Sequence, residues 1–428
     1  MCESGPSSQI EIDNDRGDLT GLKHLLEGLK GKKFHIRTFG CTFNHADSER
    51  LVAALLRMGS TPASEEEAEA IVVNTCTVIQ KTERKVLRTL EKFRTRDLYI
   101  MGCMPKVQME KIRRVCSPGV IDSEELHLCA PELGVRLRGA VGAVQIAEGC
   151  NGGCRYCITR LARGPLRSYP AEAVMNAISQ LCESGIREVQ LTAQDVAAWG
   201  TERGESLPDL LGDLLELEGD FAIRLGMMNP ASLLPIFDEI RPFFGSEHLF
   251  SFAHLPLQSG SDRVLKAMGR GYTFDDYLGM ARELRSRVPD LFLATDLIAG
   301  FPGETDGDHR LSLRAMIEME AEKVNITRYS PRPGTEAASR WDPVDRVKKE
   351  RSRQLNRMAE EIYHRKNQRL LGSIFPATTV EEVRPGSVVA RTPAYRTVVL
   401  KGPLPLGADV LVRLTEERMH YFLGERVA

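Results

Sequence analysis

Apolar and polar positions follow two periods in the first third of the chain. Short apolar runs at residues 33–39, 70–73 and 98–101 predict strands, and apolar residues at helical spacing within 47–58 and 83–93 predict helices. Because strands that alternate with helices form parallel sheets, residues 31–135 are expected to form an open parallel α/β domain.

A cysteine follows each of these strands: Cys41, Cys76 and Cys103. The carboxyl ends of parallel strands lie at one edge of the sheet, where open α/β sheets place their sites. The three thiols can converge there on one metal cluster, or they can remain three separate thiols at strand ends. Asn44 and Asp47, near the predicted start of the next helix, are interpreted first as helix caps.

The alternation continues to about residue 340. We expect six strands, at residues 144–147, 188–192, 222–226, 249–254, 292–298 and 323–328, with helices that include 171–184, 232–244, 274–287 and 308–320. A closed (β/α)₈ barrel has eight such units, so six predict an open (β/α)₆ barrel, assigned to residues 136–368, whose wide mouth can take a large substrate. A charged helix at 346–369 is interpreted as a connector.

The last stretch, residues 369–428, has short strand patterns divided by turns. Strands at 377–382, 387–391, 396–400, 409–414 and 420–423 predict a small antiparallel, OB-like β-barrel, which is a common nucleic-acid platform. Its candidate RNA-binding residues are Arg391, Tyr395, Arg396 and Lys401. The alternative is a structural cap that binds nothing.

Three cysteines in one loop carry the strongest chemical signal: Cys150, Cys154 and Cys157, spaced C-x₃-C-x₂-C. Three thiolates can bind three irons of a four-iron cluster and leave the fourth iron open for chemistry. The spacing resembles that of the radical S-adenosylmethionine (SAM) enzymes, in which the open iron binds SAM. A structural zinc site is the alternative, but no second Cys/His pair follows at the spacing of a zinc finger.

Polar residues follow the predicted barrel strands, at the end where such barrels place their sites. The candidates for binding SAM are Gln194, Asp195, Gln258, Ser259, Asp296 and Gly300. Turns also collect these residue types, so each one alone is a weak signal. The loop after the three cysteines holds Arg160, Arg163 and Arg167, which can contact RNA phosphates or can belong to a solvated surface loop.

Composition and charge limit the function classes. The chain is 42% hydrophobic and 27% charged, as in globular proteins, and it has no long apolar segment and no secretory signal, so we expect a cytoplasmic protein with no membrane contact. Ten cysteines in such a chain favour metal or redox chemistry. Five acidic residues against one arginine in residues 1–19 predict a disordered head, assigned to 1–30. A basic tail over 342–428 suits an anionic partner.

These modules, in this order, are similar to the methylthiotransferase family, the MiaB-type radical SAM enzymes, over almost the whole chain. The matching motifs are residues 39–49, 74–76, 102–103 and 148–157, followed by 256–262, 300–305 and 330–335. The resemblance implies two [4Fe–4S] clusters, an auxiliary one on Cys41, Cys76 and Cys103 and the SAM cluster on Cys150, Cys154 and Cys157. It also implies that the C-terminal segment is a TRAM domain, the RNA-binding module of the family.

The resemblance further implies an enzyme, a transferase that adds a methylthio group to a tRNA adenosine next to the anticodon. An aromatic C–H bond has no useful acidity, which explains the need for a radical. SAM would serve as both methyl donor and radical source. An electron donor and a sulfur source, neither identified by the sequence, are implied as partners, and the chain is expected to be a monomer.

The residues after the cluster loop, Ile158-Thr-Arg160 and Arg163-Gly with Ser168-Tyr-Pro170, resemble the archaeal and eukaryotic MtaB branch. Its substrate is N6-threonylcarbamoyladenosine at tRNA position 37, which becomes the 2-methylthio derivative. Three alternatives stay open: a ribosomal-protein aspartate methylthiotransferase (RimO-like), a radical SAM enzyme that inserts no sulfur, and a non-catalytic iron–sulfur RNA-binding scaffold.

Overall fold

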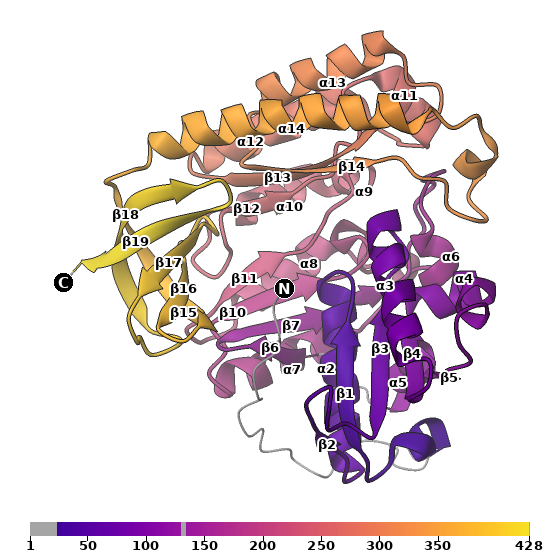
Figure 1. The fold of residues 1–428 in the computed structure, drawn as a ribbon. Helices are drawn as coiled ribbons and strands as arrows, with labels where there is room; N and C mark the ends of the chain where they lie inside the picture. The colour runs from indigo at the N-terminus through magenta and orange to yellow at the C-terminus, as the bar shows by residue number, and fades with distance from the viewer. Residues whose placement is uncertain (1–23, 130–133, 428) are drawn as a thin grey trace. The chain divides into compact units, whose positions relative to one another are not determined.

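A computed structural model describes residues 24–129 and 134–427 (Figure 1). The chain divides into two compact units, residues 1–77 with 81–132 and residues 78–80 with 133–428. The predicted acidic head lies, up to residue 23, outside the described residues. No helix within the described ranges is both long enough and apolar enough to cross a membrane.

The first unit is a parallel sheet with helices on both faces, as predicted. Its strand order is β2-β1-β3-β4-β5, with β1 at Lys33–Thr38, β2 at Thr61–Pro62, β3 at Ala70–Thr75, β4 at Asp97–Gly102 and β5 at Gly119–Val120. Its helices are α2 (Thr42–Arg57), α3 (Gln80–Phe93), α4 (Cys103–Arg113) and α5 (Ser123–Cys129), with the 3₁₀ turn η1 at Glu27–Leu29.

The fully buried strand β3 explains why both faces of this sheet are covered. Val72 packs with Leu51 and Leu55 of α2, whereas Ile71 and Val73 pack in a second core with α3 and α4. Alternate residues of a strand point to opposite faces, so a continuous apolar run requires a layer on each side.

The second unit contains the six predicted parallel strands. They are β7 (Val141–Gln145), β10 (Glu188–Thr192), β11 (Ala222–Leu225), β12 (Phe252–His254), β13 (Phe292–Ala299) and β14 (Lys323–Arg328). Hydrogen bonding divides them into β11-β10-β7 and β12-β13-β14, and parallel bridges such as Met227 to His254 join the two groups. An antiparallel strand that the sequence did not predict, β6 (Gly134–Arg138), extends the sheet beyond β7.

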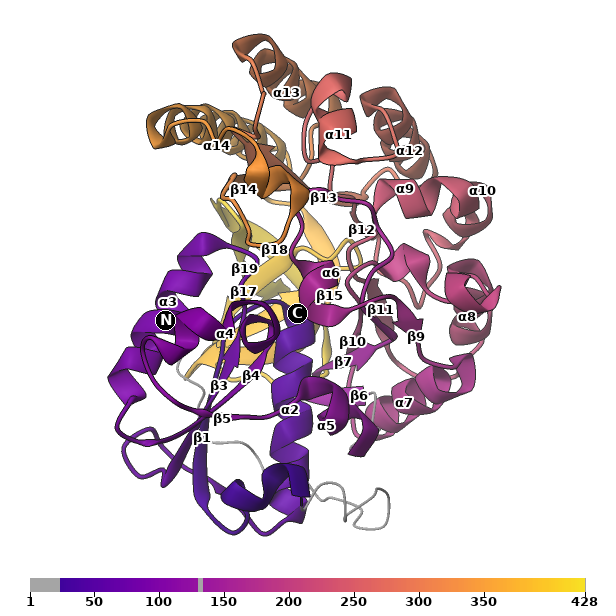
Figure 2. The same ribbon diagram turned by 90° about the vertical axis from the view of Figure 1, so that its right-hand side faces the viewer.

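The helices of this unit form an arc outside the strands and leave the barrel open on one side (Figure 2). They are α7 (Ala171–Glu183), α8 (Leu207–Leu215), α11 (Asp262–Met268), α12 (Phe274–Arg287) and α13 (Asp306–Met319), with the short α9 (Pro230–Leu233) and α10 (Phe237–Ile240) and the 3₁₀ turns η2 (Val196–Ala198), η3 (Thr201–Arg203), η4 (Leu234–Ile236) and η5 (Arg241–Phe243). The single helix predicted for 232–244 is wrong: Pro235 and Pro242 each begin a new turn. Proline lacks the N–H that a continuous helix needs.

The charged helix α14 (Asp345–Gln368) is a layer of the barrel rather than a mere connector. Leu355, Ala359 and Ile362 belong to the main apolar core, and Tyr363 bonds to the backbone of Val324 in β14. The Arg351 guanidinium donates to the buried Glu304 carboxylate at 2.8 Å. The helix therefore covers the side of the barrel that would otherwise end at the edge strand β14.

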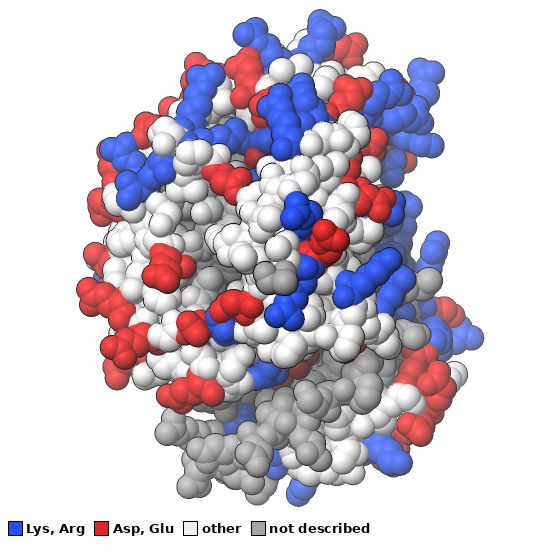
Figure 3. All heavy atoms as spheres, turned by 90° about the vertical axis from the view of Figure 1, so that its left-hand side faces the viewer, with Lys and Arg blue, Asp and Glu red and all other residues white. Residues whose placement is uncertain are grey.

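The C-terminal segment forms the closed five-stranded barrel that the sequence predicted, but it is not wholly antiparallel, because the last strand closes the barrel beside residues 397–401 in parallel. Its strands β15 (Ile374–Arg384), β16 (Ser387–Arg391), β17 (Thr397–Lys401), β18 (Asp409–Arg418) and β19 (Tyr421–Val427) close in the order β15-β16-β17-β19-β18. Figure 3 shows the molecule from the side on which this small barrel lies. In that view, Lys and Arg side chains gather most densely toward the top of the picture.

The loop between β16 and β17 closes the amino-terminal end of the larger barrel. Tyr395 lies against Phe250 and Phe252, with ring centroids 5.0 and 4.9 Å away, and its hydroxyl donates to Glu188 at 2.7 Å. Arg391 also donates to Glu188, at 3.2 Å. Tyr395 has a φ of 60°, which costs a non-glycine residue about 1–2 kcal/mol, so these contacts must outweigh that strain.

This packing corrects the predicted RNA-binding face. Arg391 and Tyr395 are held by Glu188, and the buried Arg396 pairs with Asp290 at 2.7 Å. These three polar groups are therefore turned toward the larger barrel and not toward a nucleic acid. Lys401, by contrast, is exposed and remains a predicted RNA contact.

We expect Tyr395→Phe to lower the free energy of unfolding by about 1–3 kcal/mol, because the fully buried Glu188 loses a hydrogen-bond donor. Urea unfolding followed by circular dichroism measures the change. The matched control is Tyr421→Phe, at an exposed site of the same small barrel, which should change stability by less than about 0.5 kcal/mol. Equal effects of the two substitutions would show that the contact with Glu188 does not stabilise the fold.

Candidate iron–sulfur sites

A short antiparallel ribbon closes the base of the loop that carries Cys150, Cys154 and Cys157. It is formed by β8 (Ala147–Glu148) and β9 (Arg167–Ser168), which pair with each other. The cysteine loop and the helix α6 (Thr159–Arg163) lie between the two strands in sequence. The strand predicted for 144–147 is thus placed too late, since Ala147 belongs to this ribbon. The Gly149 N–H donates to Gln194 Oε1 at 2.6 Å, which ties the loop to the end of β10.

Each of the three loop thiols has a hydrogen-bond donor directed at its sulfur. Cys150 Sγ lies 3.2 Å from the Gly152 N–H, Cys157 Sγ 3.4 Å from the Thr159 N–H, and Cys154 Sγ 3.1 Å from Arg270 Nη1. Donors of this kind stabilise negative charge on sulfur and tune iron–sulfur clusters. Burial raises the pKa of Cys150 to about 11 and also raises that of Cys157, so cluster assembly must displace their protons.

Arg270 links this loop to the polar interior of the barrel, and sequence reasoning missed it. Its guanidinium also donates to the Tyr272 hydroxyl at 2.9 Å and to the Pro256 carbonyl at 3.1 Å. The preceding residue, Gly269, ends α11 with a φ of 77°. It lies so close to the cysteine loop that a β-carbon on it would be 2.4 Å from the Gly153 carbonyl oxygen, so only glycine can place Arg270 here. A glycine that ends a helix and precedes an arginine was the available signal.

Two aspartates near this arginine have opposite pKa shifts. Burial raises the pKa of Asp195, although the Asn229 N–H and the Ser232 hydroxyl donate to its carboxylate. Burial acts on Asp296 in the same direction, but the His254 ring at 3.0 Å and the Asn325 amide at 2.8 Å outweigh it and hold its pKa below the ordinary value. The interior thus presents two different carboxyl groups: Asp296, whose ionised form is favoured, and Asp195, whose ionised form is disfavoured.

The six predicted SAM contacts fall into two groups. Gln194, Asp195 and Asp296 surround the loop and Arg270, as described above. The other three shape turns: Gln258 takes a φ of 72°, Ser259 accepts from the Ser261 N–H, and the Gly300 N–H donates to Glu304 at 2.6 Å. Direct contacts of all six with SAM remain predictions.

The predicted RNA loop is only partly available to RNA. Arg163 is buried and donates to the buried Glu148 at 3.0 Å, so its prediction as an RNA contact is wrong. Arg167 is exposed but also reaches Glu148, at 3.4 Å, and Arg160 is exposed. Arg163 instead stabilises the base of the cysteine loop.

The three cysteines of the first unit lie at the carboxyl edge of its sheet, as predicted. Cys41 precedes α2, Cys76 follows β3 directly, and Cys103 is the first residue of α4. The strand ends approach so closely that a β-carbon on Gly102, whose φ is 89°, would lie 2.5 Å from the Thr75 carbonyl oxygen.

Asn44 and Asp47 are not caps, because α2 begins at Thr42 and includes both. The buried Asn44 amide donates to Asn74 Oδ1 at 3.0 Å and to the Thr75 carbonyl at 3.1 Å, next to Cys76. Asp47 lies 2.8 Å from the His127 ring, also in the interior. The Asn44 contacts connect the helix after Cys41 with the strand before Cys76, whereas the Asp47 contact connects the same helix with α5.

Both cysteine sets offer sulfur ligands only, which is the ligand type that iron–sulfur clusters use. Throughout the described ranges, no three Cys, His, Asp or Glu side chains are arranged to hold one metal ion. In an iron–sulfur cluster each thiolate binds a different iron, so its ligands need not meet at a point. Sulfur-only ligand sets, with N–H donors directed at the loop sulfurs, suit such a cluster.

Comparison with known proteins agrees with this chemistry. Residues 144–315 match the radical SAM superfamily, and residues 33–120 match the uncharacterized protein family UPF0004. A solved radical S-adenosylmethionine methyltransferase, TsrM from Kitasatospora setae, has a similar fold, with a TM-score of 0.50 over 72% of this chain and 77% of that one at 12% identity.

Curated relatives match nearly the whole chain. A probable threonylcarbamoyladenosine tRNA methylthiotransferase of Methanothermobacter thermautotrophicus is 35% identical over 93% of this chain and 100% of its own length. The threonylcarbamoyladenosine tRNA methylthiotransferase of Xenopus laevis is 31% identical over 92% of this chain and 77% of its own length. The chain therefore belongs to the threonylcarbamoyladenosine tRNA methylthiotransferase family of radical SAM enzymes.

Proposed function

We propose that this protein adds a methylthio group to C2 of N6-threonylcarbamoyladenosine at tRNA position 37, in the cytoplasm and as a monomer. The observation that carries the proposal is the pair of cysteine sets at the carboxyl edges of two sheets, in a chain whose relatives bear this activity in their names. SAM and the two [4Fe–4S] clusters, when bound, supply the methyl group, the sulfur attachment point and the 5′-deoxyadenosyl radical that an unactivated C–H bond requires.

The residues of the second unit serve this chemistry by positioning and by charge. We assign Cys150, Cys154 and Cys157 to the SAM cluster, with Gln194 holding the loop and Arg270 compensating negative charge beside Cys154. Asp195 and Asp296 are the proposed partners for polar groups of SAM, because Asp195 follows the end of β10, Asp296 lies within β13, and both are near Arg270. Gln258, Ser259 and Gly300 shape the turns that border the same space.

The residues of the first unit hold the proposed sulfur-bearing cluster. We assign Cys41, Cys76 and Cys103 to it. The Asn44–Asn74 contacts keep the strand and helix that carry the first two thiols in a fixed relation. For the tRNA backbone we retain Arg160, Arg167 and Lys401, which are exposed.

The first test is an anaerobic reaction of the reconstituted protein with SAM, a reductant, sulfide and tRNA that carries N6-threonylcarbamoyladenosine. We expect the 2-methylthio nucleoside and free 5′-deoxyadenosine, both measured by mass spectrometry after digestion. The control is the same tRNA without the threonylcarbamoyl group. Deoxyadenosine without the modified nucleoside would direct the search to another acceptor, beginning with a ribosomal-protein aspartate.

Two cysteine substitutions separate the two clusters. Cys154→Ala should abolish SAM cleavage, whereas Cys76→Ala should retain it and stop sulfur transfer. Each variant should bind about four irons per chain where the parent binds about eight. Cys116→Ala, a buried thiol of the first unit outside both sets, is the matched control and should keep both clusters. Full methylthiolation by Cys76→Ala would rule out the auxiliary cluster.

Arg270→Met should lower the reduction potential of the SAM cluster, because reduction adds negative charge that the guanidinium beside Cys154 stabilises. Coulomb's law with an effective dielectric constant near 20 gives a shift on the order of 100 mV. Redox titration followed by electron paramagnetic resonance measures it, and Arg270→Lys, which keeps the charge, should recover most of the potential. An unchanged potential in Arg270→Met would exclude this role.

A further inference from the structure

The segment after β14 returns to the cysteine loop. We call residues 329–344 the rim segment; it includes the 3₁₀ turn η6 (Glu336–Ser339). The Ala337 N–H donates to the Arg155 carbonyl, in the cysteine loop, at 2.9 Å, and the Arg155 and Glu336 side chains form an ion pair at 3.2 Å. Tyr329 packs edge-on against Phe301, which in turn packs against Tyr156 of the same loop. The rim segment is thus held at the carboxyl-terminal mouth of the barrel.

Trp341, in this segment, is 74% exposed, the largest exposed fraction among the large apolar side chains of the described residues. Nearby Val344 is 59% exposed, and Leu161 of α6, whose side chain lies close to Gly334, is 49% exposed. The chain has two tryptophans, and the other, Trp199, is buried with its indole N–H donating to the Tyr169 carbonyl at 3.0 Å. An indole exposed at a barrel mouth does not contribute to the core and is available to a ligand.

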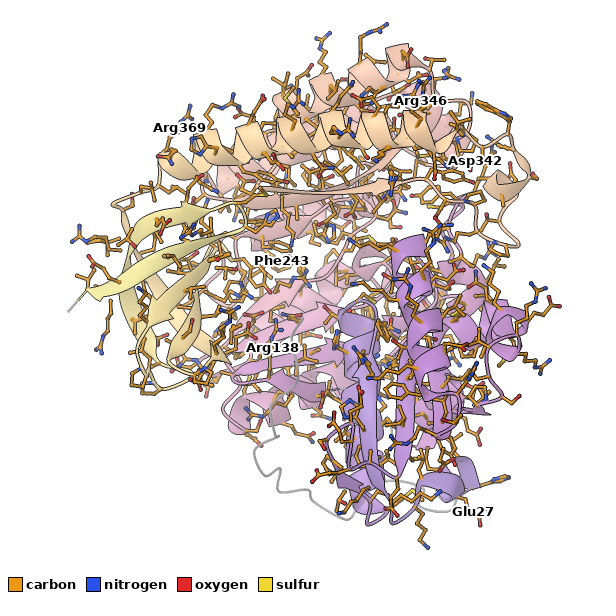
Figure 4. All side chains as sticks on the ribbon, viewed as in Figure 1. Glu27, Arg138, Phe243, Asp342, Arg346 and Arg369 are labelled. Atoms are coloured by element: carbon orange, nitrogen blue, oxygen red, sulfur yellow. The ribbon has the colours of Figure 1, made fainter. Side chains whose placement is uncertain are left out.

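The charges around Trp341 leave an excess of cations. The acidic groups of this region are paired: Glu336 with Arg155 and Arg340, and Asp342 and Asp345 both with Lys348. Arg160, Arg328 and Arg346 are exposed, and within the described part of the chain none of them has a carboxylate at ion-pair distance. Figure 4 shows Asp342 and Arg346 together at one end of α14, with Arg369 at the other.

We propose that Trp341 is a stacking platform for a base of the tRNA anticodon loop beside the modified adenosine, with Arg160, Arg328 and Arg346 contacting the adjacent phosphates. The proposal rests on the proposed function, which brings the anticodon loop to this mouth. Proteins that bind single-stranded RNA combine an exposed aromatic ring with cations that follow the backbone. The three exposed cations lie on α6, at the end of β14 and at the start of α14, which are elements that adjoin the rim segment, and they favour RNA over an apolar protein partner.

Trp341→Ala should weaken binding of an anticodon stem–loop RNA that carries N6-threonylcarbamoyladenosine by roughly 5- to 150-fold, the range measured for loss of one base stack. Trp341→Phe should recover most of the affinity. The slope of log affinity against log salt should not change in Trp341→Ala, because phosphate contacts remain, whereas Arg346→Gln should reduce that slope by about 1. Ile317→Ala, at an exposed site on α13, is the matched control and should bind like the parent.

Tryptophan fluorescence gives a second readout. Because Trp199 is buried, quenching of the reconstituted parent by the RNA should report Trp341, and Trp341→Phe should lose that quenching. Iron content and the unfolding midpoint of each variant check that the fold is intact.

Three results would overturn the proposal. If the parent modifies the RNA but Trp341→Ala binds it with unchanged affinity, the stacking role is wrong and the proposed function stands. If Trp341→Ala instead slows cluster reduction by a protein donor and not by dithionite, this surface binds an electron-donor protein. If the parent neither binds nor modifies the RNA, the proposed function fails and the stacking role fails with it.

Discussion

The position of three sulfur atoms in one loop is the constraint on which the second unit depends. That loop is closed at its base by a two-residue ribbon, tied to β10 through Gln194 and covered by Arg270 from the end of α11. Because the anchors come from separate βα units, a shift of any one unit would move a thiol relative to the others. The polar interior next to it, with Asp195 and Asp296, is arranged by the same strands.

Two peripheral elements, helix α14 and the small C-terminal barrel, stabilise this open barrel through buried polar contacts. Helix α14 bonds through Arg351 to Glu304, and the small C-terminal barrel inserts Tyr395 and Arg391 against Glu188. Burying such a pair has a desolvation cost, and removing one partner costs more because it leaves a buried charge without compensation. These pairs therefore favour the one packing arrangement in which both partners meet. The small barrel is therefore part of the structural frame of the catalytic domain.

The two cysteine sets reach similar chemistry by different routes. In the second unit three thiols are close in sequence, and one loop conformation is enough to gather them. In the first unit Cys41, Cys76 and Cys103 come from three strand ends, and only the parallel sheet and the contacts of Asn44 with Asn74 and Thr75 bring their strands into register. The set of the second unit therefore depends on local chain geometry, and the set of the first unit depends on the whole fold of that unit.

The sequence by itself determined the strand–helix alternation, the open barrel, the closed C-terminal barrel and the cysteine sets, because periodicity and close spacing are local properties. It placed the start of α2 too late, because Asn44 and Asp47 were interpreted as caps although Phe43 and Ala46 already lie on the buried face of the helix. It also could not foresee that Arg163, Arg391 and Arg396 are held by carboxylates. Only the tertiary structure brought Arg270 to Cys154 across 116 residues and Tyr395 to Glu188 across 207. Burial and pairing of a polar side chain depend on partners distant in sequence, and no local pattern encodes them.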